Sequence, residues 1–446
     1  MSGRVGFAFA LALAVAVPAP VAHAQDAPAD SALRAYFRAV SDSTDAWFGL
    51  SAQPADTAGL DSALEYGLSL PPGAARGRAA RLSFAPAFSF NRALGAVYGG
   101  SASLAGPRGL ARLTGQLQWA NGPDDWYGGG ELAVGRVLPG RDEGATFRLS
   151  AGRRFEPLNR DYYNAAFATI AALFYGSDRH SYLRRDGVRA ELARRRPAGW
   201  TAVGYRNELE SPLATTATWT LTGSDPVVVP NTPAAYGRAS ELRFAAGAKL
   251  PWAPFTLEAT MWNAGGALGG DLAYPRDRAA AGGAIGLGRR FALAPQFEYA
   301  RLTGATAPQD LLYLGGQYSL LTVDSQSLSG TGRAVGRVDL LMHEDLLSVL
   351  GLRRNPAFPL QAGAFATTGA RWGYDPSTSA ARVTARDWPG AEQWMAEAGV
   401  SLMYRPGLPD PETFFRVDYA WPLGPGDREA TLHVSWKRTL HLLGRR

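Results

Sequence analysis

Few residues of this 446-residue chain have the type and spacing that catalysis or metal binding requires. His180 follows Asp178 closely, and His433 lies two residues before Ser435 in an alternating segment. Two positions along a strand hold an imidazole and a hydroxyl in a poor geometry for proton transfer. The chain has no cysteine, and no metal-ligand spacing involves the other histidines, His23, His343 and His441. The sequence therefore predicts no enzyme, no metal site and no cofactor.

Charged residues in two later segments have the spacing of ion pairs on one face of a strand. Arg337 and Asp339 are two positions apart, as are Arg416 and Asp418. Side chains two positions apart in a strand point to the same face of the sheet. We interpret both pairs as inward ion pairs that brace the wall of a sheet, and favour this structural role over a catalytic one.

These pairs belong to segments in which apolar and polar residues alternate. A Gly/Pro-rich turn at 422–427 separates two such stretches, 413–421 and 428–438. The apolar residues of the first stretch are Phe415, Val417, Tyr419 and Trp421. The same pattern recurs from about residue 81 to the end of the chain, which predicts an all-β, antiparallel fold.

The alternation predicts about sixteen strands, an even number that is typical of bacterial outer-membrane β-barrels. We place them near 81–91, 94–104, 110–120, 128–138, 145–154, 184–194, 199–209, 239–250, 254–264, 279–289, 293–302, 333–343, 361–371, 395–405, 413–421 and 428–438. In lipid every backbone donor needs a partner, so the first and last of these strands are expected to pair and close the sheet. The predicted fold class is a transmembrane antiparallel β-barrel with a short helical N-terminal segment.

The connections between these strands sort by length. If the N-terminus is periplasmic, the long links fall on the outer side, at 155–183, 210–239, 265–278, 303–332 and 373–393. The link at 343–360 is the exception, because it is long but falls on the inner side. A soluble β-sandwich has no reason to sort its loops in this way. The aromatic link at 155–183 is expected to be partly helical and to cap the barrel, to narrow it or to lie on the outer leaflet.

The two ends of the chain have other properties. Residues 1–24 contain an early arginine, a short apolar stretch and Ala22-His23-Ala24, which predicts a secretory signal peptide. Helical spacing predicts a periplasmic helical segment over 25–78, either a mobile tail or a plug or lid. The barrel is expected over 79–440, followed by a tail at 441–446. A net charge of +6, mostly arginine and without a basic block, favours arginines in a polar lumen or at lipid phosphates over nucleic-acid binding.

A succession of short motifs near the C-terminus carries a family resemblance. The motifs are Leu314-Gly315-Gly316-Gln317-Tyr318-Ser319-Leu320, Arg337-Val338-Asp339-Leu340, Phe365-Ala366-Thr367-Thr368-Gly369, Ala398-Gly399-Val400-Ser401-Leu402 and the segment 411–423. In order and spacing they resemble the C-terminal barrel half of the BamA/TamA/FhaC superfamily, also called the bacterial surface antigen family. The resemblance implies a sixteen-stranded outer-membrane barrel that inserts or translocates other proteins.

The chain departs from the family pattern at a charge pair. In the family, a Gly-Gly pair in the sixth outer loop precedes an Arg-Gly-aromatic tip that faces an aspartate on the next inward strand. The corresponding residues are here Gly315, Gly316, Leu321, Thr322 and Val323 in the loop and Phe365, Thr367 and Gly369 on the strand. A lone buried charge is costly, so the joint loss of both charged partners is easier than the loss of one. We therefore expect an inward loop with an apolar tip. As a separate departure from the family, we expect no POTRA domains.

Three functions follow from this sequence. The first is a diverged, BamA-like barrel with a role in protein or lipid transport or insertion at the bacterial outer membrane. The alternative is a passive porin-like channel for small solutes, which needs an open polar lumen. The third is an outer-membrane lipid hydrolase, which would need a convergent triad. The expected partners are outer-membrane lipid and, through the resemblance, client proteins or periplasmic factors.

Overall fold

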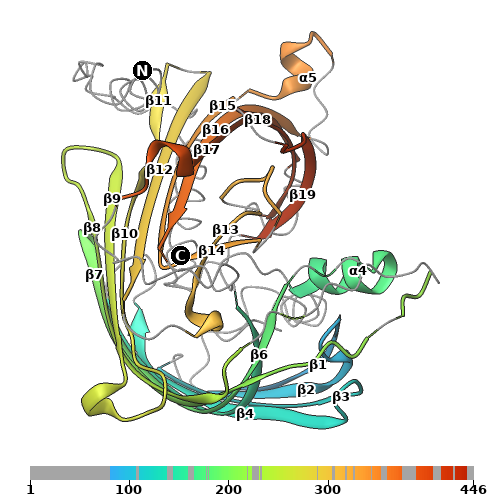
Figure 1. The fold of residues 1–446 in the computed structure, drawn as a ribbon, viewed down its shortest axis with the longest axis vertical. Coiled ribbons are helices and arrows are strands. Elements are labelled where there is room, and N and C mark those ends of the chain that lie inside the picture. Colours follow the sequence, from blue (N-terminus) through green and yellow to red (C-terminus); the bar gives the residue numbers. More distant parts are fainter. Residues whose placement is uncertain are drawn as a thin grey trace.

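The fold is that of a computed structural model of the chain, drawn in Figure 1. The residues described are 81–106, 110–137, 144–158, 165–176, 178, 180–217, 219–222, 231, 234–288, 290–303, 307–316, 319–324, 327–342, 344–352, 359–373, 388–404, 413–424 and 427–438. The signal peptide and helical segment predicted over 1–78, and the tail at 441–446, lie outside these residues.

One large antiparallel sheet contains almost all of the described strands. Its first nine strands are β1 (Arg81–Asn91), β2 (Gly95–Ala105), β3 (Ala111–Ala120), β4 (Asp125–Val137), β5 (Gly144–Pro157), β6 (Tyr182–Arg196), β7 (Gly199–Pro212), β8 (Gly237–Lys249) and β9 (Phe255–Ala264). The others are β10 (Pro275–Gly283), β11 (Ile285–Leu287), β12 (Phe291–Leu302), β15 (Gly332–Met342), β16 (Leu360–Trp372), β17 (Trp394–Tyr404), β18 (Thr413–Leu423) and β19 (Thr431–Arg438). A small hairpin, β13 (Leu312–Leu314) and β14 (Leu328–Gly330), is separate from this sheet.

Each strand of the large sheet pairs with its neighbours in sequence, as in a barrel meander. β10 and β11 pair with successive stretches of β12, so they form one interrupted strand. Counted in this way, the large sheet has sixteen described strands, as predicted. The strand predicted at 279–289 is wrong in its bounds: it begins at Pro275 and breaks at Ala284, whose N–H donates to Pro254 O.

The expected pairing between the first and last strands is not found among the described residues. The recorded partner of β1 is β2, and that of β19 is β18. Figure 1 shows why: β15 to β19 curl into a tighter arc than β1 to β10, which turns β19 toward the interior and away from β1. Each of these two strands therefore keeps one edge that no other described strand pairs with.

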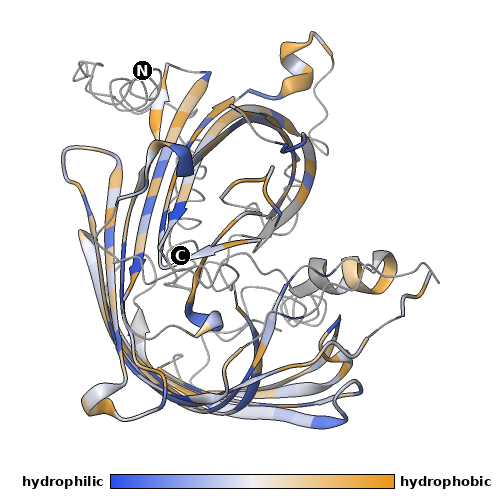
Figure 2. Ribbon diagram, viewed as in Figure 1, coloured by the Kyte–Doolittle hydropathy of each residue, from blue (hydrophilic) through white to orange (hydrophobic). Residues whose placement is uncertain are grey.

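The two faces of the large sheet differ in polarity. Large apolar side chains on alternate positions are exposed, for example Phe244, Leu257 and Phe297. The opposite face carries fully buried glutamates, which are Glu156, Glu208, Glu210, Glu298 and Glu397. Figure 2 shows the same alternation of apolar and polar residues along the strands. This arrangement is the reverse of a soluble protein, in which charged residues are seldom buried and large apolar faces are seldom exposed.

The longer connections carry the few helices. Helix α4 (Ala165–Tyr175) lies between β5 and β6, so the aromatic link there is partly helical, as predicted. Helix α5 (Leu346–Val349) follows β15, and its N-cap Asp345 accepts from the N–H groups of Leu347 and Ser348. The other helices of the described residues are short 3₁₀ turns, η3 (Gly266–Leu268), η4 (Pro308–Asp310) and η5 (Ala391–Gln393). In the described part of the chain no helix combines the length and apolar character needed to cross a bilayer.

Candidate functional site

The connection between β12 and β15 enters the interior of the curled sheet (Figure 1). It holds η4, the hairpin of β13 and β14, and a tight turn that begins at Gly315 and Gly316. Both glycines have positive φ, 119° and 88°. A Cβ on Gly315 would lie 2.2 Å from Asp324 O, and the Gly316 N–H donates to Leu320 O and Val323 O, each at 2.9 Å. This Gly-Gly pair therefore folds the loop back on itself, a conformation that other residues adopt at a cost.

Apolar side chains of this loop are packed against the sheet. Leu320 and Val323 join Leu314 of β13 and Val335 of β15 in one buried cluster. Leu321 is 8% exposed and packs in a second cluster with Phe365 of β16 and Ala420 of β18. Burying one such leucine stabilises a fold by roughly 1.5–3 kcal/mol.

The tip of the loop is held by a carboxylate that the sequence analysis did not single out. Glu397 of β17 is fully buried, and its oxygens accept from the backbone N–H of Leu321 at 3.0 Å and of Thr322 at 2.9 Å. The Thr322 hydroxyl donates to the same carboxylate at 3.0 Å and accepts from Arg428 at 3.0 Å. The tip is therefore anchored by charge-assisted hydrogen bonds to its backbone as well as by apolar contacts.

The strand that faces the tip makes room for it. Thr367 of β16 is buried and is the register partner of Glu397 on β17. A Cβ on Gly369 would lie 3.0 Å from a Leu314 methyl and 3.3 Å from a Leu320 methyl. A glycine at this position therefore lets the loop lie close against the sheet.

The four charged residues predicted to pair inside the sheet form one network. Asp339 accepts from Arg337 and from Arg416, each at 2.8 Å. Arg416 also binds Asp418 at 2.8 Å, and the Ser401 hydroxyl lies 2.5 Å from Asp418. The guanidinium of Arg337 stacks 4.2 Å above the Phe365 ring. The network thus links β15, β17 and β18. Through Arg337 it contacts Phe365, against which Leu321 of the loop tip packs.

A larger network of arginine and glutamate joins β5, β6 and β7. Glu208 binds Arg154 and Arg189, each at 2.6 Å. The other members are Glu156, which binds Arg185 at 2.5 Å and Arg189 at 2.8 Å, and Glu210, which binds Arg185 and Arg206, each at 2.9 Å. Sequence reasoning missed these pairs. Except for Arg206 and Glu210, which are both in β7, their members are distant in sequence, and only the strand register brings them together.

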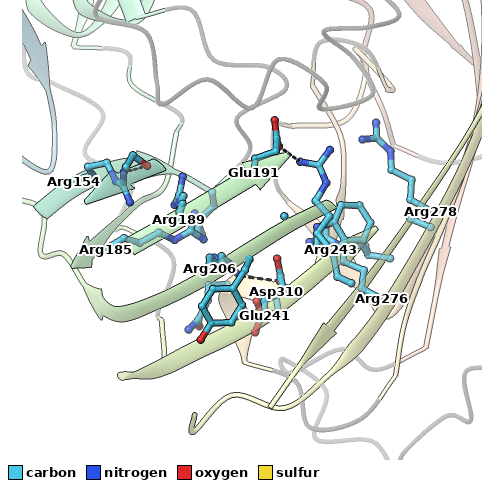
Figure 3. Close-up of a pocket in the computed structure, with 18 of the residues that line it drawn as sticks. Arg154, Arg185, Arg189, Glu191, Arg206, Glu241, Arg243, Arg276, Arg278 and Asp310 are labelled. Carbon is cyan, nitrogen blue, oxygen red and sulfur yellow. Dashed lines mark hydrogen bonds and ion pairs between the residues drawn. The ribbon is translucent and has the colours of Figure 1, made fainter. Parts of the chain in front are cut away.

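A cavity of about 280 Å³ lies between this network and the inward loop. Nine arginines line it, together with four glutamates and Asp310 of η4. Figure 3 shows Arg154, Arg185 and Arg189 on one side of the cavity, and Arg243, Arg276 and Arg278 on the other. The loop residues 309–313 form part of the wall, so the loop closes off this part of the interior.

Asp310 is the one carboxyl that the loop brings into this cavity. Burial, reinforced by the nearby Glu210 carboxylate, raises its pKa to about 7. Its Oδ2 atom has no hydrogen-bond partner among the described residues. The folded protein therefore favours the neutral carboxyl of Asp310, and ionisation of this group works against folding.

This raised pKa predicts a pH-dependent stability. The contribution of Asp310 is fully present below the ordinary pKa of 3.8 and is lost as the pH rises through about 7. Replacing Asp310 with asparagine should therefore have little effect near pH 4 and should stabilise the protein above pH 7, by on the order of a few kcal/mol. Chemical unfolding at pH 4 to 8 measures the difference between the two proteins. A difference that does not change with pH would show that folding does not raise the pKa of Asp310.

Helix α4 lies at the unpaired edge of β1. The Phe90 N–H donates to the Thr169 hydroxyl at 3.2 Å, and the Arg92 N–H donates to Asp178 at 3.0 Å. His180, noted with Asp178 in the sequence, lies 3.3 Å from that carboxylate through its Nδ1 atom. His343 and His441 lie outside the described residues. The link that carries α4 thus satisfies donors at one end of the β1 edge.

No protein-family model and no curated protein matches the chain. Among solved structures, it is similar to BamA from Haemophilus ducreyi lacking POTRA domains 1–3, with 12% identity, a TM-score of 0.48, and 81% of this chain and 71% of that chain covered. Similarity to CdiB from Escherichia coli has 13% identity and a TM-score of 0.45, over 82% and 63% of the two chains. The outer membrane protein OpdK from Pseudomonas aeruginosa aligns with 13% identity and a TM-score of 0.33, over 79% and 95%.

Proposed function

We propose that this protein is an outer-membrane β-barrel, organised like the BamA/TamA/FhaC superfamily, that inserts or transports proteins or lipids at the outer membrane. The proposal rests on the unpaired edges of the first and last strands, which we call the seam. β1 and β19 each keep an edge that no other described strand pairs with. Unpaired backbone groups at a sheet edge form a template on which a further strand can add. Client proteins and outer-membrane lipid are the proposed partners.

The polarity of the two faces supports a place in the membrane. Exposed apolar side chains recur along the strands, whereas the charged residues are buried on the opposite face. A sheet that faces hydrocarbon must place apolar groups outward and satisfy its polar groups inward. The sorting of long links to one end of the sheet is a second support, because outer loops of such barrels are longer than periplasmic turns.

The membrane location predicts a large effect of a charge on the outer face. Phe244 is 49% exposed near the middle of β8. Replacing it with arginine should destabilise the protein in lipid bilayers by about 2–4 kcal/mol, the cost of a cation near the midplane. The matched control is Trp252→Arg, in the turn between β8 and β9, which should cost much less. Unfolding of both variants in phospholipid vesicles gives the comparison, and equal small effects would argue against a lipid-facing β8.

The inward loop supports the likeness to this superfamily. Its Gly-Gly turn and its contact with β16 agree with the arrangement that the resemblance implies. Its apolar tip departs from the family, and Glu397 serves as the anchor in place of the family's charge pair. The same loop and the ion-pair networks occupy much of the interior. An occupied interior favours transport at the seam over passage of solutes through the middle.

A porin-like channel is the second candidate, and the polar, arginine-lined cavity is the observation that favours it. Planar-bilayer conductance separates the two functions. A transporter that acts at its seam should show little steady conductance while the loop is in place, whereas a passive channel should conduct in the unmodified protein.

The seam is tested by disulfide locking, which a chain without cysteine makes straightforward. One variant carries cysteine at Ser89 of β1 and at one of residues 431 to 437 of β19, chosen by scanning. The control joins Ser83 to Ser103, register partners in the paired strands β1 and β2. Oxidation joins these positions only when β19 lies against β1, so a crosslink captures the closed state of the seam. The crosslinked protein should lose activity in a reconstituted insertion assay and regain it on reduction, with the control unaffected. No crosslink at any scanned position, full activity of the crosslinked protein, or conductance without insertion would reject the proposed function.

A further inference from the structure

Six residues that line the cavity lie side by side, in register, on six neighbouring strands. In strand register, Arg148 of β5 faces Glu191 of β6, which faces Gly204 of β7. The row continues with Arg243 of β8, Trp262 of β9 and Arg276 of β10. All of these residues line the cavity. The row therefore carries three arginines and one glutamate.

The residue between Arg243 and Arg276 in this row is Trp262, whose indole carries no charge. The guanidinium of Arg276 lies 5.2 Å from the centre of the Trp262 ring, and that of Arg243 lies 6.0 Å from it. Stacking on an aromatic ring orients a guanidinium without neutralising its charge. Arg243 also forms an ion pair with Glu191, at 3.5 Å.

Arg276 differs in this respect from the other arginines of the cavity. Within the described part of the chain, neither Arg276 nor Arg148 forms a hydrogen bond or an ion pair with a side chain, whereas Arg154, Arg189 and Arg206 share buried glutamates. Arg278, two positions after Arg276 and on the same face, binds Glu298 at 2.8 Å, and Glu298 is shared with Arg333. Arg276 thus has guanidinium donors that no side chain of the described residues accepts from, although Asp310 lies near enough to interact with its charge.

We propose that Arg276 and Arg243, held on either side of Trp262 in the register of the sheet, form a binding site for a small solute that carries a phosphate or carboxylate group. Arginine suits this ligand because its planar donors match the oxygens of such groups in pairs. The volume of about 280 Å³ fits a small solute and excludes a folded polypeptide. The site goes beyond the proposed function, since it needs no opening of the seam.

Binding is measured by isothermal titration calorimetry on the full chain refolded in a zwitterionic detergent. The probes are inorganic pyrophosphate and citrate, with potassium chloride at matched ionic strength as the reference for simple screening. We expect saturable binding of at least one of the two probes, and their ratio tells phosphate from carboxylate preference. Arg276→Gln should weaken binding roughly tenfold or more, the effect of losing charge-assisted hydrogen bonds. Arg148→Gln, four strands from Trp262, should weaken it less.

The control is Arg112→Gln, which replaces an exposed arginine of β3 that donates to the Ser103 hydroxyl and does not line the cavity. It should bind the probes like the unmodified protein. Trp262→Phe keeps a ring beneath the arginines and should remove any fluorescence change caused by the probes while retaining binding. No saturable binding of either probe, or equal binding by Arg276→Gln and Arg112→Gln, would overturn the proposal. Because the assay contains no membrane and no client protein, this result is independent of insertion activity.

Discussion

Replacing Glu397 with alanine is expected to release the tip of the inward loop and to lower the free energy of unfolding by roughly 2–6 kcal/mol. The carboxylate accepts from the N–H groups of Leu321 and Thr322 and from the Thr322 hydroxyl. Without it, two buried backbone donors lose their partner, at roughly 1–3 kcal/mol each. Apolar contacts of Leu321 with Phe365 remain, so the loop should loosen without leaving the interior altogether.

Two measurements separate this local release from a general loss of fold. Limited proteolysis should cut the variant faster between residues 303 and 331 than elsewhere, and chemical unfolding should give the lower stability. Thr322→Val removes only one of the three donors and should cost about 1 kcal/mol. The exposed Glu392→Ala, five positions before Glu397, should have almost no effect. Unchanged cleavage in Glu397→Ala would mean that apolar packing alone holds the loop.

A comparable loss is expected from Glu208→Ala, in the network between β5, β6 and β7. This glutamate is fully buried and binds Arg154 and Arg189, each at 2.6 Å. Removing one partner of a buried ion pair leaves an uncompensated charge and typically costs 3–5 kcal/mol. Replacement of both arginines and the glutamate by apolar residues of similar size should cost less than the single change, because Glu156 loses Arg189 but keeps Arg185, and no charge is left without a partner.

The control for Glu208 is an ion pair at the surface. Glu344 binds Arg290 at 3.1 Å, with 42% and 72% of these side chains exposed. Glu344→Ala should cost 0–1 kcal/mol, since water replaces the lost partner. Unfolding of both variants in the same detergent gives the ratio of the two effects. Similar small losses would indicate that water reaches Glu208 and that the network adds little to the stability of the wall.

The sequence by itself determined the strands and the faces of the sheet. Alternation with a period of two is a local property, so Arg337 and Asp339 point to one face and their apolar neighbours to the other whatever the strand pairs with. The sequence likewise placed Gly315 and Gly316 in a long link, and glycine adopts at the least cost the positive φ that the structure shows there. The number of strands and the long links at one end follow from the same local pattern.

Only the tertiary structure decided which of these residues meet. Glu397 lies 76 positions from Leu321, and Glu156 lies 33 positions from Arg189. The local spacing of residues in the sequence therefore predicts neither contact. The row from Arg148 to Arg276 exists because the register of six strands aligns it. The expected pairing of β1 with β19 is not found among the described residues. It assumed uniform curvature, whereas the tighter arc of β15 to β19 around the inward loop turns the last strand away from the first (Figure 1).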